Sequence, residues 1–321
     1  MEKLLFNEAL EDGLDNMIVV TGIQRSGTTI AGKTISSFDQ VEYSYEPPLA
    51  YYANALLRLG EAGPEEALRW LRVYLYHDLF LNYQLGRNYN FRSTDDSCIL
   101  NVKPYRAIVD KWQSIKDNAT GVGNQYLKKA RFSFKLPDVY ALLPVLMNAF
   151  KGLKVVDMNR DLNRVFVSMM VKQYFSDAAM KKGSASGNLW PFFGLPGDYK
   201  TPSLVEQRDF TFWQTANAVS RTAYMCCKIA EQKLQFKKLL GTEPDLIARY
   251  REIPYEEMLL QPQTTFNGIA DFLEVSWGKL TVAIVSEIKN TERKLHIEDL
   301  IAQCDPVVYA RMTELNRQLG Y

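Results

Sequence analysis

Residues Asn16 to Pro48 read NMIVVTGIQRSGTTIAGKTISSFDQVEYSYEPP, and this stretch decides the fold. The run from Met17 to Val20 is apolar and β-branched, and Gly22 soon follows it, so we predict a buried strand there. A loop of small residues comes next, and we predict a helix from about Thr28 to Phe38. The stretch therefore forms a strand, a tight glycine turn and a helix N-terminus.

A turn of this kind is suited to binding an anion. Backbone N–H groups converge at the start of the helix, and the positive end of the helix dipole favours phosphate or sulfate. The hydroxyls of Ser26, Thr28 and Thr29 add hydrogen-bond donors, and Arg25 adds a guanidinium that can hold an oxyanion through two bonds. The loop therefore predicts a site for a phosphorylated or sulfated ligand.

A second register of the same loop predicts an ATP-dependent kinase. The pattern GxxxxGK[ST] runs from Gly27 to Thr34, and in it Lys33 would grip the β and γ phosphates while Thr34 would hold magnesium. That motif needs its first glycine directly after the strand, where Gly22 stands instead. We keep this alternative open, with Asp157 after an apolar run as its second magnesium group.

The composition is that of an ordinary globular chain. Its 321 residues are 47% hydrophobic and 23% charged, with a formal net charge of +1. This charge gives no reason to expect nucleic acid or a membrane surface as a partner. There is no apolar run of spanning length, no secretion-signal pattern and no metal-ligand spacing among the four cysteines, so we expect a cytoplasmic protein with reduced thiols.

Residues 131–170 read RFSFKLPDVYALLPVLMNAFKGLKVVDMNRDLNRVFVSMM and alternate between strand and helix. We predict strands at about 131–135 and 153–158, each followed by a helix. Such alternation is typical of a parallel sheet covered on both faces, so the predicted fold is α/β, a three-layer α/β/α arrangement around a central parallel sheet. We expect one domain over 1–321, with helical insertions at about 49–95 and 176–245.

The first loop resembles the 5′-phosphosulfate loop of sulfotransferases that use 3′-phosphoadenosine 5′-phosphosulfate (PAPS). Their loop reads P-[KR]-S-G-T-T, and a glutamine takes the place of the proline here. The resemblance implies a P-loop-like fold without a metal, in which the phosphosulfate contacts Gln24, Arg25, Ser26, Gly27, Thr28 and Thr29.

Residues 154–168 resemble the 3′-phosphate motif of the same families, which reads approximately hhhhhRxPxxxxxS. Arg160 follows the strand and Ser168 comes eight residues later, as in the family, whereas Leu162 stands where a proline is usual. The resemblance implies that Arg160 and Ser168 bind the 3′-phosphate. The residues alone also allow an Arg160–aspartate ion pair and a helix serine bonded to the backbone.

The resemblance also implies the catalytic groups. Lys135 ends its strand as the family's lysine does, and that lysine approaches the transferred sulfuryl group and the leaving oxygen, where Arg25 would assist it. The cytosolic branch has a histidine base directly after this lysine. This chain has none there, because its two histidines are His77 and His296.

The general base must therefore come from another residue. In the branches that sulfate polysaccharides or protein tyrosines it is a glutamate shortly after the loop, and Glu46, followed by Pro47, has that placement. Glu42 is the fallback. An ordinary exposed turn carboxylate is the other interpretation of Glu46.

A third stretch, residues 254–273, resembles the family's Y-E-D-[LM]-x-x-x-P segment, and the resemblance implies that Tyr255 lies against the adenine. Arg293 and Lys294 fall where the family has a basic loop over the 3′-phosphate, although the glycine-aspartate-tryptophan companion is missing. Residues 171–206, rich in glycine, proline and aromatics, are either an acceptor-binding lid or an ordered insertion. We predict one long helix over 207–240.

The function implied by the resemblance is transfer of a sulfuryl group from PAPS to a hydroxyl or amine, which leaves adenosine 3′,5′-bisphosphate. The acceptor, whether a small molecule, a sugar or a peptide, is not indicated. Two alternatives stay open: the kinase that uses Lys33 and Asp157, and a non-catalytic nucleotide-binding protein of the same fold.

Overall fold

The structure is a computed structural model, and it describes residues 8–43, 46–79, 81, 89–94, 98–117, 130–182, 191–193, 197–289 and 297–321. Within these ranges a sheet of five parallel strands forms the centre, in the order β2-β3-β1-β4-β7. In that order the strands are Val41–Tyr43, Arg131–Lys135, Ile18–Gly22, Lys154–Asn159 and Tyr250–Pro254. The predicted α/β fold with a parallel sheet is confirmed.

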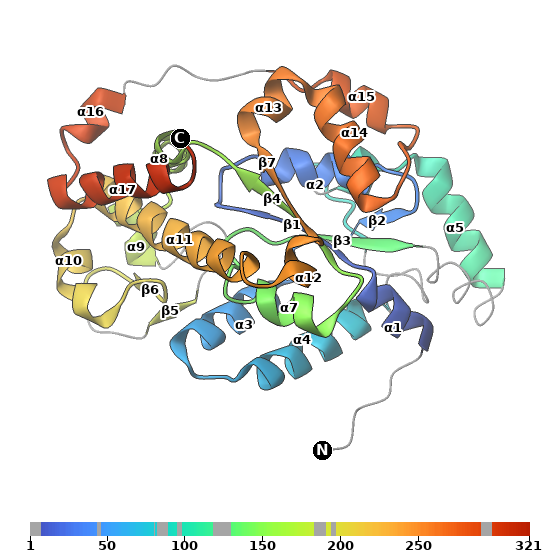
Figure 1. Cartoon of the computed structure of the whole chain (residues 1–321), viewed down its shortest axis with the longest axis horizontal. Helices are drawn as coiled ribbons and strands as arrows, with labels where there is room; N and C mark the ends of the chain where they lie inside the picture. The colour runs from blue at the N-terminus through green and yellow to red at the C-terminus, as the bar shows by residue number, and fades with distance from the viewer. Residues whose placement is uncertain are drawn as a thin grey trace.

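The sheet lies between two helical layers, because the side chains of each strand alternate between two hydrophobic cores. Ile18 and Val20 of β1 pack into one core, whereas Val19 packs into the other. The first core is covered by α2 (Thr28–Ser36), α13 (Tyr255–Leu260), α14 (Pro262–Leu273) and α15 (Thr281–Ser286), which lie together above the sheet in Figure 1.

The second core lies on the opposite face of the sheet and is the larger of the two. Its helices are α1 (Glu8–Asp15), α3 (Pro48–Leu59), α4 (Pro64–Leu79), α7 (Leu143–Ala149), α8 (Leu162–Val171), α11 (Ala218–Leu240) and α17 (Pro306–Gln318). The three-layer arrangement predicted from the sequence is therefore present.

Other elements complete the described part of the chain. The strands β5 (Phe192–Phe193) and β6 (Thr201–Pro202) form an antiparallel pair. The remaining elements are η2 (Ile99–Asn101), α5 (Tyr105–Asp117), α9 (Asp177–Lys182), η4 (Gln207–Asp209), α10 (Phe210–Thr215), α12 (Pro244–Ile247) and α16 (Ile297–Ile301).

The single helix predicted over 207–240 is wrong, because the chain breaks between α10 and α11. Ala216 is extended, and the side chain of Asn217 accepts a hydrogen bond from the backbone N–H of Ser220 at 2.8 Å. An asparagine that bonds the backbone in this way starts a new helix. α11 then packs against α8 and α17, and the division into one domain with two insertions stays a prediction.

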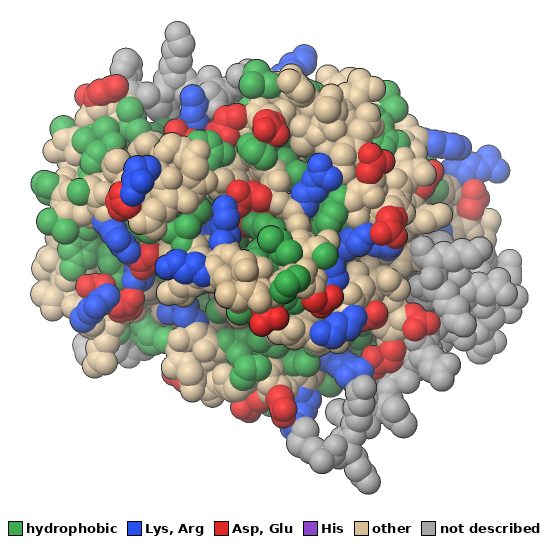
Figure 2. Space-filling model, viewed as in Figure 1, with side chains coloured by type: hydrophobic (Ala, Val, Ile, Leu, Met, Phe, Trp, Pro, Cys, Tyr) green, Lys and Arg blue, Asp and Glu red, His purple; other side chains and the backbone are tan. Residues whose placement is uncertain are grey.

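Basic and acidic side chains are interspersed on the face that Figure 2 shows, in keeping with the near-neutral net charge. All four cysteines are buried with free thiols. Over the described residues, we find no helix whose length and apolar character would let it cross a bilayer.

Candidate functional site

The predicted loop lies between β1 and α2, at the carboxyl ends of the central strands, where parallel sheets bind their ligands. Two glycines, Gly22 and Gly27, allow the backbone of this loop to take its course. A Cβ on Gly22 would stand 2.7 Å from the Met158 carbonyl oxygen, and one on Gly27 would stand 2.5 Å from the Tyr255 ring. Gly27 also has a φ of +92°, which favours glycine. The backbone therefore approaches its neighbours too closely for side chains at both positions.

Arg25 lies at the centre of the predicted anion-binding residues. Its Nε donates to the Ser168 hydroxyl at 3.1 Å, and its carbonyl oxygen accepts from Nη1 of Arg160 at 2.8 Å. Arg25 also has a φ of +74°, which is uncommon for a residue with a side chain. The fold thus brings together three residues that the sequence motifs had singled out.

Tyr255 completes this cluster from the start of α13. Its ring lies against Gly27 on one side, and the Arg160 guanidinium stands 4.2 Å from the ring centroid. A cation over an aromatic face is held by the ring's quadrupole. Tyr255 therefore fixes the direction of Arg160, and its predicted contact with an adenine stays a prediction.

The structure explains why a leucine, Leu162, stands where the family has a proline. Its backbone N–H donates to Oδ1 of Asn316 on α17 at 2.7 Å, a bond that a proline could not make. Asn159, at the end of β4, donates from Nδ2 to the Leu319 carbonyl oxygen at 3.1 Å. The C-terminal helix thus supports the strand end that carries Arg160, a role that the sequence analysis missed.

The proposed catalytic groups also lie side by side. Nζ of Lys135 is 2.5 Å from Oε1 of Glu46 and 3.3 Å from the Thr29 hydroxyl. The Glu46 side chain is 26% exposed, so it is neither fully buried nor free in solvent. Glu46 is therefore not an isolated turn carboxylate, because it pairs with Lys135, which also contacts the loop through Thr29.

Glu42, the fallback base, is engaged elsewhere. Its Oε2 is 3.0 Å from Nζ of Lys111 on α5, and its side chain is only 8% exposed. Glu46 instead pairs with Lys135, which also contacts the loop. Its place beside these residues favours Glu46 over Glu42 as the base, and this choice stays a prediction.

Asp138, three residues beyond the end of β3, was not predicted from the sequence. Its Oδ1 accepts a hydrogen bond from the backbone N–H of Gln24 at 2.8 Å, so it supports the predicted phosphosulfate loop. Burial raises the pKa of the Asp138 carboxyl to about 8; the Glu46 carboxylate adds to this, and the Gln24 N–H opposes it. The one sequence feature that could have indicated this role is the presence of an acidic residue three positions after Lys135.

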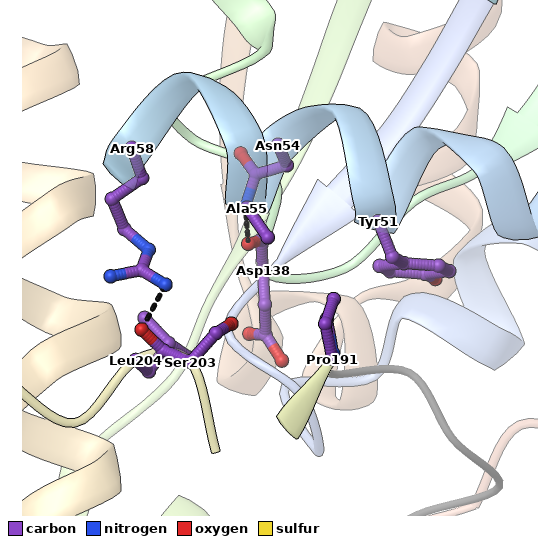
Figure 3. A pocket seen from close by; sticks show the side chains of 8 residues that line it. All are labelled: Tyr51, Asn54, Ala55, Arg58, Asp138, Pro191, Ser203 and Leu204. Carbon is purple, nitrogen blue, oxygen red and sulfur yellow. Dashed lines mark hydrogen bonds between the residues drawn. The ribbon is translucent and has the colours of Figure 1, made fainter. Parts of the chain in front are cut away.

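Asp138 also lines a pocket between α3 and the β5–β6 segment (Figure 3). Asn54 donates from Nδ2 to the Asp138 carbonyl oxygen at 3.3 Å, and Arg58 donates to the Ser203 carbonyl oxygen. Part of this wall falls in residues 171–206, which were predicted to be either an acceptor-binding lid or an ordered insertion, and their role stays a prediction. The full lining is Tyr51, Asn54, Ala55, Arg58, Asp138, Pro191, Ser203 and Leu204.

The raised pKa of Asp138 predicts a pH-dependent stability. Between about pH 4 and pH 8 the folded chain holds one more proton than the unfolded chain, so this group's contribution to the free energy of unfolding falls as pH rises, by about 1.4 kcal/mol per unit. Asp138→Asn keeps an acceptor for Gln24 and removes the titration. We expect it to be more stable than the parent by a few kcal/mol near pH 7–8, as measured by urea denaturation.

The comparison is made between the two proteins at several pH values, because other groups titrate equally in both. A difference in unfolding free energy that stays constant from about pH 5 to pH 8 would contradict the raised pKa.

The kinase alternative does not fit the structure. Gly27–Thr34 is not a loop, because α2 begins at Thr28 and Lys33 lies within it. The Asp157 side chain lies on the opposite side of the sheet from α2, where it accepts hydrogen bonds from Tyr250 at 2.7 Å and Lys233 at 3.1 Å. Tyr140 is a third donor, at 3.0 Å. Asp157 is thus held in a buried network away from Lys33.

Arg293 and Lys294 lie outside the described residues, so their predicted place over a 3′-phosphate stays a prediction. The other predicted residues converge at the carboxyl ends of β1, β3, β4 and β7.

The chain is similar to several solved sulfotransferase structures. One is a sulfotransferase from Mycobacterium tuberculosis H37Rv, with 13% identity, a TM-score of 0.43, and coverage of 92% of this chain and 78% of that chain. Another is the sulfotransferase domain of the Synechococcus PCC 7002 olefin synthase, with 12% identity, a TM-score of 0.45, and coverage of 95% and 94%. A third is the sulfotransferase domain from the curacin biosynthetic pathway, with 15% identity, a TM-score of 0.43, and coverage of 90% and 96%.

These proteins belong to the class that the sequence motifs resemble. No protein-family description and no curated protein matches the chain.

Proposed function

We propose that the chain is a sulfotransferase that moves a sulfuryl group from PAPS to an acceptor hydroxyl or amine. The observation that carries this proposal is the cluster around Arg25, which contacts both Ser168 and Arg160 beside the glycine loop. One anion can bind the loop's N–H groups while a second binds Arg160, which comes from a different strand end. A nucleotide charged at both its 5′ and 3′ positions fits two such sites.

The loop residues themselves support an anion at the first site. The Ser26 hydroxyl is almost completely buried, and it has no hydrogen-bond partner in the described part of the chain. A buried hydroxyl without a partner costs free energy, so a ligand oxygen at this point would satisfy it. Thr28 and Thr29 begin α2 and place further donors at the positive end of the helix.

The catalytic step follows from the pairing of Glu46 with Lys135. Glu46 takes the proton of the acceptor group, whose oxygen or nitrogen forms a bond to sulfur as the bond between sulfur and the bridging oxygen breaks. The bridging oxygen leaves with the electron pair as part of the phosphate, and Lys135 and Arg25 neutralise its charge. The contact between Glu46 and Lys135 supports a transfer in which the base and the cation act close to each other.

A transfer assay tests this function. The protein is incubated with sulfur-labelled PAPS and a mixed panel of alcohols, phenols, sugars, amines and tyrosine peptides, and both labelled acceptor and released bisphosphate are measured. We expect acceptor-dependent release of bisphosphate.

Two results would count against the proposal. Tight binding of bisphosphate without transfer to any acceptor would indicate the non-catalytic alternative. Failure of bisphosphate to bind would remove the proposed site altogether.

A further inference from the structure

The chain makes a tight turn immediately after β1, over residues 23–26. The backbone N–H of Ser26 donates to the Ile23 carbonyl oxygen at 3.0 Å, and Arg25, the third residue of the turn, has a φ of +74°. Gln24, the second residue, has no such positive φ. A positive φ at the third position alone is the conformation of a type II turn. Arg25 is therefore held in a backbone conformation that costs free energy for a residue with a side chain.

A type II turn favours proline at its second position, because the ring fixes φ near the required value of about −60°. This chain has Gln24 there, which differs from proline in that its backbone carries an N–H. That N–H donates to Oδ1 of Asp138 at 2.8 Å. A hydrogen bond to a residue 114 positions away therefore holds the part of the turn that a proline ring would otherwise fix.

Asp138 is bonded to the loop through its backbone as well. Its N–H donates to the Gly22 carbonyl oxygen at 3.1 Å, so two hydrogen bonds join the loop to the segment that follows β3. Nδ2 of Asn54 on α3 donates to the Asp138 carbonyl oxygen at 3.3 Å, as a dashed line in Figure 3 marks. Oδ1 of Asn54 in turn accepts from the Leu142 N–H at 3.1 Å. The acceptor for the Gln24 N–H is thus fixed in place by its surroundings.

Arg25 is thereby held from both sides. The residue before it is bonded to Asp138, and its own carbonyl oxygen accepts from Nη1 of Arg160 at 2.8 Å. Its side chain then reaches the Ser168 hydroxyl, to which Nε donates at 3.1 Å. Asp138 and Gln24 are 3% and 5% exposed, so the bond between them is shielded from water. A strained backbone conformation persists where the surroundings fix it in this way.

From this geometry we propose that Asp138 is a positioning residue: by accepting from the Gln24 N–H, it holds the turn that presents Arg25 and the following N–H groups to the 5′-phosphosulfate. The inference rests on the proposed transfer function and deepens it, because it assigns the shape of the loop to a residue outside the loop. Asp138 acts through the loop and not by touching the nucleotide. A ligand that uses the loop therefore depends on Asp138, whereas a ligand that uses Arg160 alone does not.

The test removes the hydrogen bond from either side. Asp138→Gly deletes the acceptor, and glycine suits the φ of +61° at this position, so no backbone strain is added. Asp138→Asn keeps an amide oxygen for the Gln24 N–H. Gln24→Pro fixes the turn by a ring, but the ring carbon that replaces the hydrogen points at Oδ1, which is only 2.8 Å from the nitrogen. We therefore expect Gln24→Pro to be tolerated only where Asp138→Gly has removed the carboxyl.

Affinity is measured by calorimetric titration with adenosine 3′,5′-bisphosphate, AMP and adenosine 3′-monophosphate. We expect Asp138→Gly to weaken binding of the first two by about tenfold, through the loss of one hydrogen bond that orders the loop, and of the third by no more than about threefold. Asp138→Asn should stay within about threefold of the parent for all three. Asp110→Gly, at a side chain that is 61% exposed on α5, should change none of them.

The double variant separates positioning from a general loss of structure. Gln24→Pro alone should weaken AMP binding by at least about tenfold, whereas Gln24→Pro combined with Asp138→Gly should restore the affinity to within about threefold of the parent. Gln24→Ala combined with Asp138→Gly keeps the N–H without an acceptor and should restore nothing. A residue with a purely structural role would weaken all three nucleotides alike.

Three results would overturn the inference while the parent binds bisphosphate normally: AMP affinity of Asp138→Gly within about threefold of the parent, an equal loss for adenosine 3′-monophosphate, or no recovery in the double variant. If urea denaturation shows that Asp138→Gly does not fold, Gln24→Pro must show the same selective loss, and unchanged AMP affinity would overturn the inference. Failure of the proposed function appears instead in the parent itself, as absence of bisphosphate binding or of transfer to every acceptor.

Discussion

Glu46→Gln is expected to lower kcat by about 10²–10⁴-fold while the affinity for adenosine 3′,5′-bisphosphate stays within about twofold. The physical reason is that glutamine has nearly the same shape but cannot accept the acceptor's proton. Glu46 contacts Lys135 and not the residues that cluster around Arg25, so nucleotide binding should not depend on its charge. Single-turnover transfer and calorimetric binding measure the two quantities separately.

The control for this substitution is Glu61→Gln. Glu61 is exposed just after α3, so this variant makes the same chemical change away from the site. It should leave both quantities unchanged. Equal losses of kcat and nucleotide affinity in Glu46→Gln would contradict the role of Glu46 as the base. A second comparison with Glu42→Gln separates the two candidate bases, since Glu42 should affect stability through Lys111 and not the chemical step.

Arg160→Ala is expected to weaken binding of adenosine 3′,5′-bisphosphate by about 10–100-fold, which corresponds to the loss of one charge-assisted hydrogen bond to a phosphate. Binding of AMP, which lacks the 3′-phosphate, should weaken by no more than about threefold. A small effect on AMP is expected because Arg160 also donates to the Arg25 carbonyl oxygen and so helps to hold the loop.

Arg106→Ala is the matched control, since Arg106 is 91% exposed on α5. It should change neither affinity. If Arg160→Ala weakened bisphosphate and AMP equally, Arg160 would be a structural residue of the loop, and the proposed 3′-phosphate site would be wrong.

Local patterns were sufficient for the parts of the site that lie at the ends of strands. The β-branched run before Gly22 and the helix from Thr28 are both present, because burial on two faces requires an apolar strand and the glycine allows the turn. The alternation over 131–170 likewise placed Lys135 and Arg160 at the same edge of the sheet.

Contacts between distant segments could not be predicted in this way. The bond from Leu162 to Asn316 spans 154 residues, and nothing in either local sequence indicates it. The break at Asn217 depends on whether an asparagine bonds the backbone or points outward, and the helical pattern of the flanking residues concealed it. Asp138 is unusual for its burial behind the loop and its positive φ of 61°, neither of which its local sequence indicates.

The most direct test of the site is calorimetric titration of the unmodified protein with adenosine 3′,5′-bisphosphate, AMP and ATP with magnesium. We expect the bisphosphate to bind at least about tenfold more tightly than AMP, and ATP to gain nothing from magnesium. Equal affinities for bisphosphate and AMP, or tight binding of ATP that depends on magnesium, would contradict a pocket built for a nucleotide that is charged at both its 3′ and 5′ positions.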